Sequence, residues 1–84
     1  MSTEATEHKS LADALPAEIA RVQAKRERWI GYAREMGPQG AAGIAVTMRI
    51  MQIEINEAVQ ALASGDVVRM IRAHEALKGY SDDD

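Results

Sequence analysis

The stretch AGIAVTMRIMQIEINEAVQALA, from Ala42 to Ala63, decides the fold because it carries two apolar rows at helical spacing and no proline. The first row steps by three and four residues and consists of Ile44, Met48, Met51, Ile55, Ala58 and Leu62. The second row lies on another side, is interrupted by Glu57, and consists of Val46, Ile50, Ile53 and Ala61. A helix with one apolar row packs against one surface, so two rows predict neighbours on two sides. This stretch is therefore expected to be the central helix.

The segment before it predicts a first long helix over about residues 16–36. Its apolar row consists of Leu15, Ile19, Val22, Trp29, Ala33 and Met36, with Arg26 at one intervening row position. Pro16 is expected in the first turn of that helix, where its missing N–H has no partner to lose. The turn GPQGAAG (37–43) is short, so the two long helices are expected to be antiparallel neighbours.

A third, shorter helix is predicted over about residues 66–78. Gly65 can end the central helix, and Asp66 is a good N-cap for the next one. We expect its inner face to consist of Val67, Met70, Ile71, His74 and Leu77, with Tyr80 able to fold back over the bundle. The fold class is thus all-α: an antiparallel hairpin of two long helices plus a third helix, forming a three-helix bundle.

The domain organisation expected is a flexible polar arm (1–14), one helical domain (15–80) and an acidic tail (81–84). The chain of 84 residues has no cysteine and only three aromatic residues, one Trp and two Tyr, so its core must be aliphatic and free of disulfides. A single core of this size rarely supplies more than about 3–5 kcal/mol. We therefore expect self-association, with a dimer favoured. There is no apolar signal segment or membrane-spanning run, which favours a cytoplasmic location and no membrane partner.

Catalytic and metal chemistry have little support in the sequence. There are two histidines, no cysteine and no plausible pair of nucleophile and base. We therefore expect no enzyme activity, no catalytic residue, no metal and no cofactor.

The first helix carries a cluster of cations, Arg21, Lys25, Arg28 and Arg34. This basic face could bind an acidic protein surface or, weakly, a phosphate backbone. Interleaved glutamates favour an ordinary solvated face instead. The net charge of −3 argues against a dedicated nucleic-acid binder.

Arg26 has two possible roles at its row position. Its aliphatic stem can pack while the guanidinium reaches solvent, which is the more common arrangement. Alternatively, it forms a partly buried ion pair with Glu54 or Glu57, which would fix the register of the helices.

Three residues of the second row, Val46, Ile50 and Ile53, also have two possible partners. Either the third helix covers them or they meet the same row of a second subunit. We favour the second subunit, because the third helix is short and a two-fold axis lets each central helix use one row inside and one across.

Three segments together resemble a known group of proteins: LPAEIARV (15–22), GPQGAAGIAVTMR (37–49) and ASGDVVRMIRAHEALKGY (63–80). They are similar to short helical accessory proteins encoded by transposable, Mu-like temperate phages and prophages of proteobacteria. The resemblance implies a small protein that acts by binding a host or defence protein, for example as an inhibitor. Two alternatives stay open: a nucleic-acid-associated helper using the basic first helix, and a small-ligand sponge with a pocket between subunits.

Overall fold

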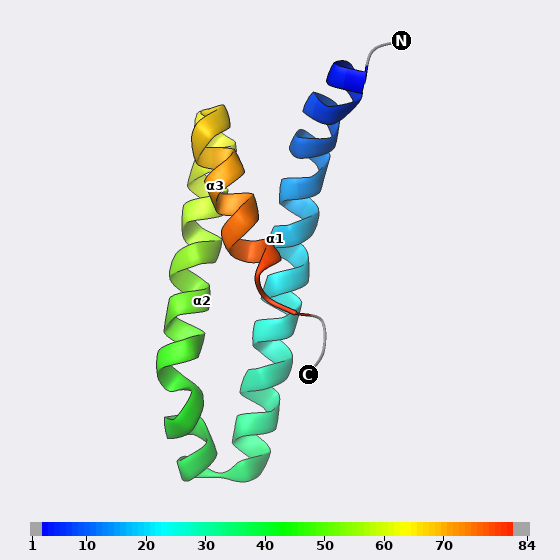
Figure 1. Cartoon of the computed structure of the whole chain (residues 1–84). Helices are drawn as coiled ribbons and strands as arrows, with labels where there is room; N and C mark the ends of the chain where they lie inside the picture. The colour runs from blue at the N-terminus through cyan, green and yellow to red at the C-terminus, as the bar shows by residue number, and fades with distance from the viewer. Residues whose placement is uncertain (1–2, 82–84) are drawn as a thin grey trace.

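The chain folds into three helices in a computed structural model that describes residues 3–81, with side chains described from Leu11 onward. The helices are α1 (Thr3–Met36), α2 (Pro38–Ser64) and α3 (Val67–Lys78), and there is no strand within the described part of the chain. α1 and α2 form an antiparallel hairpin, and α3 turns back along it and contacts both (Figure 1). The predicted all-α three-helix bundle is confirmed. The acidic tail at 82–84 lies outside the described residues.

The hairpin turn is tighter than the sequence pattern predicts, because α2 begins at Pro38 rather than near residue 42. Only Gly37 separates the two helices, and it has a φ of 85°, which favours glycine. Pro38 starts α2 without losing a hydrogen bond. The first turn of α2 lies very close to α1, since a Cβ added to Gly40 would be 2.5 Å from the Cβ of Met36. Glycine has no Cβ and therefore allows this close approach.

α1 is longer than predicted, since it begins at Thr3 and not at Pro16. Pro16 lies inside the helix, where it lacks the N–H that would bond to the preceding turn. The segment before it contains several Ala, Glu and Leu residues, which are good helix formers, and the helix continues through it. The predicted arm is thus helical from Thr3 onward. Its flexibility and the predicted domain division stay predictions.

The core lies between the hairpin and α3, and it follows the first row of α2 closely. Met51, Ile55 and Ala58 are at most 1% exposed, and Met48 is 6% exposed. α1 contributes Leu15, Ile19 and Val22 to the same cluster, while Met36 at the end of its predicted row is 63% exposed. α3 ends near the middle of the hairpin, so the end that carries the Gly37 turn consists of α1 and α2 alone (Figure 1).

The inner face of α3 differs from the predicted one. Its buried residues are Met70, Ala73 and Leu77, whereas Val67 and Ile71 are each 48% exposed. The Asp66 side chain caps α3 by accepting hydrogen bonds from the backbone N–H groups of Val68 and Arg69, at 3.0 and 3.2 Å. The predicted and the observed inner faces of α3 both have helical spacing. The small side chain of Ala73 lets α3 approach the hairpin closely.

No helix among residues 3–81 has the length and apolar character needed to cross a membrane.

Candidate interaction surfaces

The outer row of α2, which we define as Val46, Ile50 and Ile53, lies in solvent on the side opposite the core. These side chains are 71%, 48% and 50% exposed, respectively. The helical period explains the arrangement, because residues spaced by three and four form one line on the helix surface. α3 does not cover the outer row, so the possibility that the third helix buries these residues is wrong. The interface with a second subunit stays a prediction.

Charged residues of opposite sign flank the outer row. Arg49 precedes Ile50 in the chain, and Glu57 lies one helical turn beyond Ile53; both are exposed. Neither has an ion pair or side-chain hydrogen bond within the described part of the chain. The sequence contains part of this signal, since Glu57 interrupts the second row.

α3 presents a second exposed apolar surface, formed by Val67, Val68 and Ile71. Their side chains are 48%, 58% and 48% exposed. The surface results from the rotation of α3 toward its Met70, Ala73 and Leu77 face, so the predicted core position of two of these residues is wrong.

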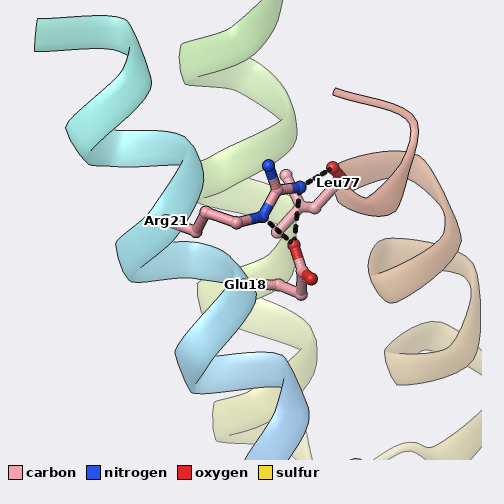
Figure 2. Close-up of polar contacts among 3 residues, drawn as sticks. All are labelled: Glu18, Arg21 and Leu77. Carbon is pink, nitrogen blue, oxygen red and sulfur yellow. Dashed lines mark hydrogen bonds and ion pairs between the residues drawn. The ribbon is translucent and has the colours of Figure 1, made fainter. Parts of the chain in front are cut away.

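Arg21, one of the four predicted basic-face residues, makes contacts inside the protein. Its Nε donates to a carboxylate oxygen of Glu18 at 2.8 Å, and its Nη2 donates to the backbone carbonyl of Leu77 at 3.0 Å (Figure 2). Leu77 lies in the last turn of α3, where backbone carbonyls carry partial negative charge. A cation at this position stabilises the end of α3 and ties it to α1.

The other three basic residues do not form one exposed face with Arg21. Lys25 is 7% exposed, and its Nζ lies 5.4 Å from the centre of the Trp29 ring, a cation–π distance. Arg28 and Arg34 are exposed, but their spacing places them on different sides of α1. A partner for these residues stays a prediction.

Arg26 adopts neither of its two predicted roles fully. Its Nε donates to the backbone carbonyl of Met48 at 3.1 Å, which links α1 to α2. It makes no ion pair with Glu54 or Glu57 among the described residues. Arg26 is half-buried at its row position, and its head group bonds to backbone rather than to a carboxylate.

Glu54 instead accepts a hydrogen bond from the Tyr80 hydroxyl, which brings the segment after α3 back onto α2. The pKa of Tyr80 is raised to about 12, mainly by burial and also by the hydrogen bond to Glu54 and the negative charge of Glu54. This contact joins residues far apart in the sequence, and the sequence alone indicated only that Tyr80 could fold back.

The surface of the described part of the chain has hollows, two of which lie along α2. The larger, about 350 Å³, lies between α2 and α3, and its charged lining consists of Glu54, Glu57, Arg69 and Arg72. The smaller, about 240 Å³, lies between α1 and α2 near the hairpin turn; it is mostly apolar, with Ile30, Ile44 and Met48 and a single cation, Arg34.

No group of three or more His, Asp or Glu side chains that could hold a metal ion occurs among the described residues. The expectations of no cofactor and no catalytic residue stay predictions. Comparison of the chain with protein families, with curated proteins and with solved structures found no match. The resemblance to phage accessory proteins therefore stays a hypothesis drawn from the sequence.

Proposed function

We propose that this chain is a non-enzymatic protein-interaction module that works in the cytoplasm as a homodimer. The observation that carries the proposal is the amount of large apolar side chain left outside the core. Among residues 11–81, nine large apolar residues are exposed, whereas twelve apolar residues are buried, of which four are alanine, leaving eight large ones. Six of these exposed residues lie in two groups, the outer row of α2 and the exposed surface of α3, and exposed apolar patches mark protein-binding sites.

The outer row of α2 is the proposed site of self-association. It lies on the longest stretch of α2 without glycine or proline, and its side chains are exposed. A two-fold axis on this face lets the same three residues serve both subunits. Burying them would add to a core that is small for an independent fold.

The exposed apolar surface of α3 is the proposed contact for a second, different protein. Val67, Val68 and Ile71 lie on a short helix away from the outer row of α2, so they stay accessible in a dimer formed through α2. In line with the resemblance in the sequence, this second protein would be a host or defence protein whose activity the phage or prophage accessory protein modulates, for example by inhibition.

Nucleic-acid binding has less support. Arg21 donates to Glu18 and Leu77, and Lys25 is buried beside Trp29, so only Arg28 and Arg34 of the proposed basic face are exposed. Phosphate contacts make affinity fall steeply with salt. If the affinity of the chain for its partner does not change with salt concentration, the nucleic-acid alternative is excluded. For a ligand sponge, native mass spectrometry would have to reveal a bound small molecule.

Thermal unfolding at several protein concentrations tests the proposal. A dimer that unfolds to separate chains has a midpoint that rises with protein concentration. We expect this rise for the wild type and its loss in Ile50→Lys, which places like charges across the two-fold axis. Val59→Lys is the matched control, because Val59 is also exposed on α2 but lies about two and a half turns from Ile50, on the other side. A wild-type midpoint independent of concentration contradicts the proposal.

A further inference from the structure

The outer row of α2 has a direction, because the charges beside it differ in sign along the helix. Arg49 lies level with the middle of the row and Glu57 lies beyond its C-terminal end. Both are exposed and have no ion pair or side-chain hydrogen bond within the described part of the chain. Any second copy that binds this row must place its own Arg49 and Glu57 somewhere along the same line.

The two possible directions of a second α2 have opposite electrostatic consequences. In a parallel pair, each residue lies level with its own copy, so Arg49 meets Arg49 and Glu57 meets Glu57. In an antiparallel pair about a two-fold axis near Met51 and Gln52, Ile50 of each copy lies level with Ile53 of the other. Arg49 of one copy is then three residues, or about 4.5 Å along the axis, from the level of Glu57 of the other. Packed helices lie about 8–10 Å apart, which an arginine and a glutamate side chain can bridge.

We propose that two copies of this chain pair through α2 in the antiparallel direction, with Ile50 and Ile53 at the axis and Arg49 of each copy paired with Glu57 of the other. The inference rests on the proposed self-association and adds its geometry. A second copy fits this surface better than an unrelated protein does, because one two-fold operation supplies an apolar row and both opposite charges at once.

Within one chain, the cations near Glu57 form no ion pair with it among the described residues. Arg69 and Arg72 of α3 line the hollow that Glu57 also lines, yet no ion pair joins them to it among the described residues. Glu54, the other carboxylate on this flank, accepts the Tyr80 hydroxyl. Glu57 is therefore the carboxylate on α2 that is open to Arg49 of a second copy.

Charge reversal distinguishes the two directions. In the antiparallel pair, Arg49→Glu and Glu57→Arg each turn two attractive contacts into repulsive ones, and the double variant restores both. Exposed pairs are each worth about 0.2–1 kcal/mol, so each single variant is expected to raise the dimer dissociation constant about tenfold. In the parallel pair, the single variants exchange one like-charge contact for another, and the dissociation constant stays near the wild-type value.

Sedimentation velocity over a concentration series measures these dissociation constants. Arg34→Glu and Glu75→Arg are the matched controls, because they change the net charge equally at exposed positions away from the outer row, and circular dichroism confirms that every variant is folded. We also expect an equal mixture of Arg49→Glu and Glu57→Arg to form a heterodimer more tightly than either variant forms a homodimer. A dimer whose dissociation constant is unchanged by the single variants overturns the antiparallel pairing and leaves the proposed dimer intact. A wild-type chain that is monomeric throughout the series overturns the proposed self-association itself.

Discussion

The two sides of α2 carry similar residues in very different surroundings. On the inner side, Met51 and Ile55 are each 1% exposed, whereas on the outer side Ile50 and Ile53 are 48% and 50% exposed. Isoleucine occurs on both sides, so residue type does not explain the contrast; the neighbouring helices do. The inner row is explained by the fold of one chain. The outer row contributes little to that fold, and we propose that it binds a second copy.

The largest expected effect comes from truncating one isoleucine on each side. Ile55→Ala should lower the free energy of unfolding by about 2–5 kcal/mol, because it leaves a cavity in the core. Ile50→Ala should lower it by less than about 1 kcal/mol when measured by urea denaturation at a concentration where the dimer is dissociated. Similar losses for the two variants would show that the sides do not differ in this way.

Arg21 holds α3 against α1 at the inner side of the bundle. Arg21→Ala removes the hydrogen bond to the Leu77 carbonyl at the end of α3. We expect a loss of about 1 kcal/mol, with faster amide exchange in α3 than in the wild type. Arg34→Ala, which changes an exposed cation on the same helix, serves as a control. Unchanged exchange in α3 would mean that the Arg21 contact does not hold that helix.

The hydrogen bond between Tyr80 and Glu54, on the flank of α2, should make the free energy of unfolding depend on pH. Tyr80→Phe should cost about 1 kcal/mol at neutral pH, since partial exposure weakens the hydrogen bond to Glu54. The pKa of Tyr80 is raised from its ordinary value of 10.0 to about 12, so the folded state favours the neutral phenol. The stabilisation is therefore fully present below pH 10 and is lost as the pH rises through 12. Urea denaturation of both proteins across this range checks the sign: a difference that grows with pH would contradict it.

Arg26 should give the smallest effect. Arg26→Leu keeps an apolar stem at the row position and removes one hydrogen bond to a helix carbonyl, so we expect a change within about 1 kcal/mol. Arg26→Asp should be more destabilising, because it replaces that stem with a short carboxylate beside the Met48 carbonyl. A thermal melt of the two variants is the measurement. A loss of several kcal/mol for leucine would instead indicate that the charge of Arg26 is needed.

The sequence predicted the parts of the fold that depend on helical period and on turn residues. The inner row of α2, the buried residues in the first half of α1 and the caps at Gly65 and Asp66 follow these rules, because they depend on spacing and local backbone geometry. The face of α3 was misjudged, since in a short helix with apolar residues on several sides the spacing allows more than one inner face.

The candidate site was predicted less completely. Val46, Ile50 and Ile53 were identified as a separate row, and exposure of the row agrees with that assignment. Lys25 is predicted at the surface, but its side chain is buried and its Nζ lies over the ring of Trp29, one helical turn further along α1. The Arg21–Leu77 and Tyr80–Glu54 contacts join segments that are distant in the sequence, and such contacts leave no periodic signal.

The most direct test measures molar mass by light scattering after size exclusion, for the wild-type chain and for Ile50→Lys. It tests whether the inner side of α2 stabilises one chain while the outer side binds a second copy. We predict a wild-type mass of about 18 kDa, twice the 9.2 kDa of one chain, and a helical Ile50→Lys chain of 9.2 kDa. Circular dichroism of the same fractions shows whether the variant is folded. A wild-type mass of 9.2 kDa at every concentration, or an Ile50→Lys chain that loses its helices along with its partner, would contradict the account.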